Sequence, residues 1–183
     1  MAGRAATVWI FALSLAASAP RAEPAQTAPT APTAPTAPTA TLTTAEMGRI
    51  VSGIGLSLAP DGRHIDDPNC GRVDARFETV DLNRDGTPEL FLFYGDTCTS
   101  GATGVSLVLF VKDATGAYRA ELGFPAADYT AVGPGRLGFP DLEVRGMGFC
   151  AGVWRWDGKD YQHFCNRPDE PGGCGDQGQI CSP

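Results

Sequence analysis

Hydrophobic residues follow two different spacings along the chain, and each spacing predicts one kind of secondary structure. Between residues 43 and 58 the apolar side chains recur at helical spacing: Met47, Ile50, Val51, Ile54 and Leu58. The preceding Thr43-Thr44-Ala45-Glu46 is a capping box, in which a threonine and a glutamate side chain satisfy free backbone amides at the start of a helix. We therefore expect one short amphipathic helix at the start of the folded part.

From residue 72 onward, short runs of aromatic and β-branched residues alternate with turn residues, and this pattern predicts strands. The expected strands are residues 73–80, 89–94, 105–112, 118–122, 142–145, 152–156 and 160–164, with turns or polar loops at 66–69, 83–86, 97–104, 113–116, 133–135 and 157–158. Residues 91–93 and 107–111 are apolar on both faces, which is typical of central strands. The predicted fold class is mainly β: an antiparallel meander, as a small barrel or sandwich, with one N-terminal helix and disulfide staples.

The first 41 residues have a different composition from the rest. Arg4, the apolar run Val8–Leu15 and the small residues Ala16–Ala19 have the layout of a secretory signal peptide, expected over residues 1–22. Thr-Ala-Pro triplets then predict a disordered, extended linker over residues 23–41, and a single β-rich domain over residues 42–183. The apolar run is shorter than the roughly 20 residues that span a bilayer, so we expect a periplasmic or secreted protein without membrane insertion.

The charge of the chain limits its partners. The chain has 14 basic and 21 acidic side chains and a formal charge of −7. A surface of this sign repels nucleic acid and anionic lipid, and attracts cations and basic proteins. Nucleic-acid binding is therefore not expected.

The cysteines predict disulfides, because an exported chain with an even number of them usually oxidises them in pairs. Cys70 and Cys98 are centred on position 84, so the hairpin around this position favours their pairing. Cys150 and Cys165 are centred on Asp157-Gly158, which signals a two-residue hairpin turn and places Trp154 opposite Tyr161. This second pairing has an alternative, because either cysteine could instead reach the remaining two, Cys174 and Cys181.

Residues 81–90, Asp-Leu-Asn-Arg-Asp-Gly-Thr-Pro-Glu-Leu, alternate oxygen-bearing side chains around one glycine. Ca²⁺ prefers six to eight oxygen ligands, and Gly86 permits the sharp bend that gathers them. The expected ligands are the side chains of Asp81, Asn83 and Asp85, the backbone carbonyl of Thr87, and Glu89 directly or through water. An EF-hand would need a further glutamate where Leu92 stands, so this class is not expected. A lanthanide, with similar size and more charge, fits the same oxygen set.

This stretch resembles the FG-GAP or VCBS-type calcium loop, Asp-x-Asn-x-Asp-Gly-x-x-Asp/Glu followed by an apolar strand, which occurs in β-propeller blades. Glu89 replaces the more usual aspartate at the ninth position, and the chain has one good copy, so the resemblance does not extend to a propeller. Residues 138–144 echo residues 86–92 as a degenerate repeat that lacks the upstream acidic residues.

The mature chain is also similar to a family of small bacterial periplasmic proteins without an established activity. The similarity lies in Pro140–Val144, Gly148–Cys150 and Arg155–Tyr161. It implies a periplasmic β-rich fold.

Residues that would carry catalysis are scarce. His64 and His163 belong to no metal or nucleophile motif, and we expect each to be a surface residue or one satisfied by a neighbour. Asp141 and Glu143 alternate along a strand, which predicts that both face solvent. We therefore expect no enzyme, no catalytic residue and no organic cofactor. The prediction is a periplasmic Ca²⁺-binding or lanthanide-binding protein. The alternative is an acidic inhibitor of a basic cell-wall hydrolase, with a purely structural calcium site.

Overall fold

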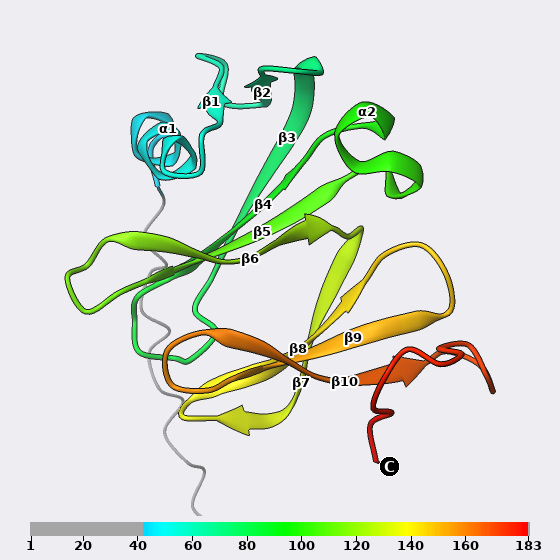
Figure 1. The fold of residues 1–183 in the computed structure, drawn as a ribbon. Helices are drawn as coiled ribbons and strands as arrows, with labels where there is room; N and C mark the ends of the chain where they lie inside the picture. The colour runs from blue at the N-terminus through cyan, green and yellow to red at the C-terminus, as the bar shows by residue number, and fades with distance from the viewer. Residues whose placement is uncertain (1–41, 183) are drawn as a thin grey trace, which may run out of the picture. The chain divides into compact units, whose positions relative to one another are not determined.

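The computed structural model describes residues 42–182, and their strands form two antiparallel sheets (Figure 1). The first sheet contains, in order, β1 (Ser57–Leu58), β2 (His64–Asp67), β3 (Gly71–Val80), β4 (Glu89–Tyr94), β5 (Ser106–Lys112) and β6 (Tyr118–Pro125). The second contains β7 (Asp128–Arg136), β8 (Phe139–Arg145), β9 (Cys150–Trp156) and β10 (Tyr161–Pro168). Within each sheet, every strand pairs with the next along the chain, so both sheets are meanders. The signal peptide and linker predicted for residues 1–22 and 23–41 lie outside the described residues.

The helices are short, and side-chain caps define where they begin. α1 (Thr44–Ser52) follows Thr43, whose Oγ1 accepts from the Glu46 amide at 3.3 Å while its own amide donates to Glu46 Oε2 at 2.8 Å. α2 (Thr97–Ser100) and the 3₁₀ helix η1 (Gly101–Thr103) occupy the stretch that was expected to be a loop. Asp96 caps α2 by accepting hydrogen bonds from two of its amides, a signal that the loop interpretation missed.

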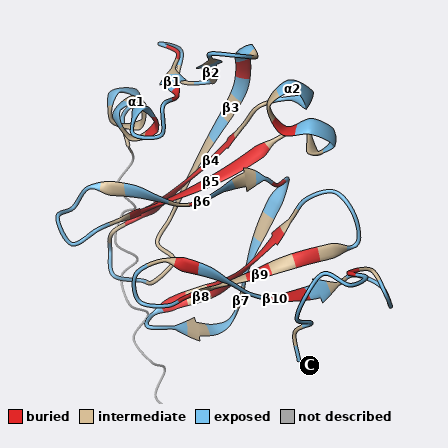
Figure 2. Ribbon diagram, viewed as in Figure 1, coloured by how far each residue is buried: buried red, intermediate tan, exposed pale blue. Residues whose placement is uncertain are grey.

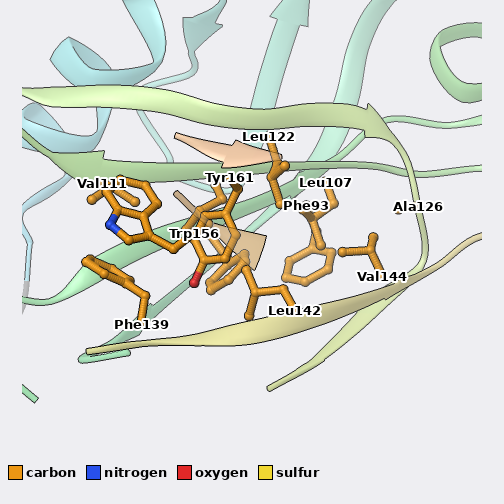
Figure 3. Close-up of a cluster of buried hydrophobic side chains, with 12 residues drawn as sticks. Phe93, Leu107, Val111, Leu122, Ala126, Phe139, Leu142, Val144, Trp156 and Tyr161 are labelled. Atoms are coloured by element: carbon orange, nitrogen blue, oxygen red, sulfur yellow. The ribbon is translucent and has the colours of Figure 1, made fainter. Parts of the chain in front are cut away.

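Strands β4 and β5 are central and buried on both faces, as their apolar runs predicted (Figure 2). Their side chains alternate between two hydrophobic clusters. Phe91, Phe93, Leu107, Leu109 and Val111 face a cluster shared with the second sheet (Figure 3). The residues between them pack with α1 and β1–β3 in a second cluster: Leu90, Leu92, Val108 and Phe110.

Three strands were not predicted. β1 and β2 are short, and β2 buries only Ile65, so its polar residues resembled a loop. β7 contains Gly133-Pro134-Gly135, which was expected to be a turn. The register of β7 against β8 breaks between Val132 and Arg136, so this segment is an irregularity within the strand.

The β9–β10 hairpin differs from the predicted one in its turn and its register. Asp157 closes a four-residue turn: its amide donates to the Asp160 carbonyl at 3.0 Å, and its Oδ1 accepts from the Lys159 and Asp160 amides. A bulge at Phe164 then shifts the pairing by one more residue. As a result, Tyr161 lies opposite Trp156, and Trp154 lies opposite His163, so the predicted pair of Trp154 with Tyr161 is wrong.

Three disulfides join all six cysteines. The Cys70–Cys98 bond confirms the favoured pairing and links the turn between β2 and β3 to α2. The pairing of Cys150 with Cys165 is wrong: Cys150 bonds Cys174, and Cys165 bonds Cys181. The cause is the shifted register, which places Cys150 opposite Pro168 and frees both cysteines for the C-terminal segment. Disulfides of this number are typical of proteins in an oxidising compartment.

No helix within residues 42–182 is long and apolar enough to cross a membrane.

Candidate metal-binding loop

The acidic loop of residues 81–88 joins β3 to β4, the central hairpin of the first sheet. Val80 and Glu89 pair across its base, so the last predicted ligand is the first residue of β4. The structure brings all five predicted ligands into this one turn. Asp81, Asn83 and Thr87 are half-buried, Asp85 is exposed, and Glu89 is buried at 2% exposure.

Asp81 fixes the path of the loop. Its Oδ1 accepts from the Asp85 amide at 3.0 Å, and its Oδ2 accepts from the Gly86 amide at 2.9 Å. Gly86 has φ = 85°, a left-handed conformation that glycine adopts without a steric penalty, so the predicted bend lies at the predicted residue. Arg84 is also left-handed, with φ = 61°, which no sequence signal indicated.

Asn83 and Asp85 continue the same pattern. Asn83 Oδ1 accepts from the Asp85 amide at 3.0 Å, and its Nδ2 donates to Asp85 Oδ2 at 2.8 Å. Asp85 Oδ1 accepts from the Thr87 amide at 2.7 Å. Partial burial opposes ionisation of Asp85, but these hydrogen bonds and the charge of Lys112 outweigh it and hold its pKa below the ordinary value.

The Glu89 carboxyl lies at the base of the loop. Its Oε2 accepts from the amide of Leu82 at 2.8 Å, and Leu82 packs against the hydrophobic cluster between the sheets. Burial raises the pKa of the Glu89 carboxyl to about 7 against the hydrogen bond from Leu82, and the charges of Asp85 and Asp81 raise it further. The base of the loop therefore holds a carboxyl group whose ionisation is disfavoured by its surroundings.

The second sheet contains a buried acidic residue, Asp141, in a position equivalent to that of Glu89. Tyr118, the first residue of β6, donates its hydroxyl to the Pro88 carbonyl at 2.8 Å, and Tyr161, the first residue of β10, donates to Pro140 at 2.9 Å. The acidic residue after each proline is buried: Glu89 and Asp141. The echo between residues 86–92 and 138–144 therefore corresponds to a similar arrangement of strands β3–β6 in the first sheet and β7–β10 in the second.

Asp141 has a basic partner, whereas Glu89 has none among the residues that the structure describes. Arg155 donates from Nε and Nη2 to both oxygens of Asp141, at 2.9 and 2.6 Å. Within residues 42–182, no lysine, arginine or histidine forms an ion pair with Glu89. A buried carboxylate normally has a cationic partner, because its desolvation is costly otherwise.

The acidic side chains of the loop bind its own amides instead of converging on a common point. Within the described part of the chain, no three His, Cys, Asp or Glu side chains are already arranged to hold a metal ion. The donor set is nevertheless entirely oxygen, as Ca²⁺ or a lanthanide requires. A carboxylate has about four lone-pair positions, so accepting one or two amides leaves capacity for an ion.

Asp141 and Glu143 were expected to face solvent, and this prediction is wrong. Both lie on the outer face of the second sheet but are buried, with 6% and 4% exposure. Glu143 accepts from Arg145 and Arg167, as Asp141 does from Arg155. Alternation correctly placed both acids on one face. The arginines that cover them come from β8, β9 and β10, and no pattern local to β8 could indicate the two that lie on other strands.

Both histidines have polar partners. His64 Nδ1 lies 2.7 Å from Asp61 Oδ2, and His163 Nε2 lies 2.9 Å from Asn166 Oδ1. Glu121 on β6, which the sequence did not single out, has a side chain only 1% exposed. It lies at a bulge, where the alternation that would place it on the solvent face is broken.

Comparison with protein-family models, with curated proteins and with solved structures gives no match to this chain. The functional argument therefore rests on the geometry of the loop.

Proposed function

We propose that this chain is an exported, periplasmic metal-binding protein that holds Ca²⁺, or a lanthanide of similar size, in the loop from Asp81 to Glu89. It acts through binding rather than through catalysis. The ion would be held by the side chains of Asp81, Asn83 and Asp85, the carbonyl of Thr87, and Glu89 at the base. When bound, the ion supplies positive charge to a turn that otherwise concentrates three carboxyl groups.

The observation that supports this proposal is the environment of Glu89. Its carboxyl is 2% exposed, has no basic partner within the described residues, and adjoins the charges of Asp81 and Asp85. In the other meander the equivalent Asp141 is neutralised by Arg155. A cation in the loop would supply for Glu89 the charge that arginine supplies for Asp141.

The backbone of the loop is sharply bent and held by hydrogen bonds. The amide hydrogen bonds to Asp81 and Asn83, together with the left-handed Gly86, fix the turn without an ion. Binding would require the contact between Asn83 Nδ2 and Asp85 Oδ2 to open, so that both side chains present oxygen to the ion. This is a rotation of side chains and not a refolding of the loop.

The test is calorimetric titration of the metal-stripped chain with Ca²⁺, Mg²⁺ and La³⁺, beside Asp85→Ala and Asp113→Ala. Asp113 is a matched control because its Oδ1 also accepts the amide two residues ahead, but in the β5–β6 turn. We expect one site for Ca²⁺ and La³⁺, weaker binding of Mg²⁺, and loss of the site in Asp85→Ala alone. Equal binding by both variants, or no binding at millimolar Ca²⁺, would refute the proposal.

A thermal melt of the same variants separates two roles for the ion. An ion that serves the fold would leave Asp85→Ala markedly less stable than the calcium-loaded parent, whereas an ion that is handled or buffered would leave the metal-free chain folded. The hydrogen-bonded loop favours the second outcome.

A further inference from the structure

A hollow of about 280 Å³ lies on the outer face of the second sheet and shares no residue with the acidic loop. Residues from all four strands of this sheet line it. One wall is the irregular part of β7, which begins at Val132. The other wall is the C-terminal segment, which runs beside β10 and includes Gln179 and Ser182 (Figure 1). The disulfide between Cys165 and Cys181 anchors this second wall covalently.

Two arginines beside the hollow are held in place by buried carboxylates. Arg155 donates from Nε and Nη2 to Asp141, at 2.9 and 2.6 Å, and Arg167 donates from Nη1 to Glu143 at 2.6 Å. The side chains of the two acids are 8% and 5% exposed, whereas those of the arginines are 36% and 48% exposed. Phe164 stacks on Arg155, with 3.4 Å between the guanidinium carbon and the ring centroid. Because the arginines are already oriented, a ligand that binds them loses little affinity to side-chain ordering.

Both guanidinium groups keep N–H groups that are free to bind a ligand. Within residues 42–182, Nη1 of Arg155 and the Nε and Nη2 of Arg167 donate no hydrogen bond. The acids that hold the two arginines lie two residues apart on β8, and two residues span about 7 Å of a strand. A carboxylate that accepts charge-assisted hydrogen bonds of about 2.8 Å on either side spans a similar distance. One small anion can therefore reach both arginines.

The other residues that line the hollow limit the class of ligand. Two guanidinium groups and one carboxylate line it, so the hollow has a net positive charge although the formal charge of the chain is −7. This charge favours an anion. Val132, Val153 and Phe164 add apolar surface beside the arginines. A carboxylate matches the fork of a guanidinium group, and an organic group attached to the carboxylate can cover the apolar side chains.

We propose that this hollow binds a small carboxylate that carries an apolar group. The carboxylate lies between Arg155 and Arg167 and accepts hydrogen bonds from both, and the apolar group lies against Phe164 and Val132. The C-terminal residue of a peptide and a short-chain organic acid both have this chemistry. The site is separate from the acidic loop, so this proposal and the proposed function do not depend on each other.

The test is an NMR titration of the whole chain, free of metal and of chelator, with hexanoate, Nα-acetyl-leucine, the uncharged amide of Nα-acetyl-leucine, and inorganic phosphate. We expect the signals of the Phe164 ring and of the Arg155 Nε–H group to shift and saturate with both carboxylates, but not with the amide or phosphate. Tighter binding of Nα-acetyl-leucine would indicate a peptide C-terminus as the natural ligand, and tighter binding of hexanoate would indicate an organic acid. No shift with either carboxylate, or an equal response to the amide or phosphate, would overturn the proposal.

Two arginine variants separate binding in the hollow from a general loss of structure. Glu143 pairs with Arg145 as well as with Arg167, so Arg167→Gln and Arg145→Gln each leave it with one arginine. Of the two arginines, only Arg167 lines the hollow. We expect Arg167→Gln to weaken binding of Nα-acetyl-leucine about tenfold or more, because hydrogen bonds to a charged group are lost, and Arg145→Gln to change it little. Equal weakening in both variants would overturn the proposal, and the titration of the parent chain decides the matter if Arg167→Gln does not fold.

Discussion

Glu89 accepts the backbone amide of Leu82 at 2.8 Å, so the first residue of β4 closes the acidic loop that precedes it. The bond joins a buried carboxyl group to a residue anchored in the hydrophobic cluster between the sheets. It explains how the loop keeps its shape although three acidic side chains lie within nine residues.

The variant Glu89→Gln separates the effect of this carboxyl group on stability from its effect on Ca²⁺ binding. Glutamine keeps the acceptor for Leu82 and removes the buried charge, so the metal-free variant should be more stable than the parent at pH 8, by about 1 kcal/mol. Its Ca²⁺ affinity should fall about tenfold or more, since affinity depends on the number of charged ligands. Urea unfolding in chelator and calorimetry measure the two effects. Unchanged Ca²⁺ affinity would remove Glu89 from the ligand set.

The stability of the metal-free chain should fall as pH rises from about 5 to 7. Glu89 and Glu121 each have an ordinary pKa of 4.5 that the fold raises to about 7. Between these values the folded chain binds more protons than the unfolded chain, so deprotonation favours unfolding and the loss levels off above pH 7. Urea midpoints at pH 5, 6, 7 and 8 in chelator measure the slope. Glu89→Gln and Glu121→Gln should each make this slope less steep. A stability that does not change with pH in the parent would contradict the raised pKa of both carboxyl groups.

Arg155→Ala should destabilise the second sheet strongly. It leaves the buried Asp141 without its two hydrogen bonds and removes the guanidinium that stacks 3.4 Å from the Phe164 ring centroid. A loss of about 2 kcal/mol or more is expected, because the remaining carboxylate is buried and unpaired. Arg72→Ala is the control: its pair with Asp66 is exposed to solvent, so its loss should change the stability much less. Urea unfolding compares them, and equal losses would contradict the account of the buried pair.

Peptide mapping without reduction tests the disulfides. A protease that cuts before aspartate separates four cysteines, because Asp157, Asp160, Asp169 and Asp176 lie between them. We expect residues 141–156 linked to 169–175, and 160–168 linked to 176–183. A link between residues 141–156 and 160–168 would show that Cys150 bonds Cys165 and would contradict the structure.

The sequence predicted the structure best where the structure depends on the pattern of neighbouring residues. The doubly apolar runs predicted central strands β4 and β5, and the spacing of Cys70 and Cys98 around one loop predicted their bond. It was least informative where one residue changes the register. Asp157 closes a four-residue turn and Phe164 forms a bulge, and together they redirect Cys150 and Cys165.

Part of the candidate site could likewise be predicted from neighbouring residues, and part could not. The alternation of Asp81, Asn83 and Asp85 around Gly86 indicated the turn, and the structure gathers these residues as expected. The burial of Glu89 depends on the packing of Leu82, and the absence of a basic partner for it within residues 42–182 depends on which strands carry arginines. Neither feature could be predicted from the local sequence pattern. Glu121 was not singled out from the sequence, because the bulge at which it lies leaves no signal in the local pattern.

The most direct test of the proposed function is a crystal structure of the chain grown with Ca²⁺. The account predicts one ion in the β3–β4 loop, with oxygens of Asp81, Asn83, Asp85 and Thr87 at about 2.3 to 2.6 Å and Glu89 bound directly or through one water. An empty loop at millimolar Ca²⁺, with Asn83 still donating to Asp85, would contradict it.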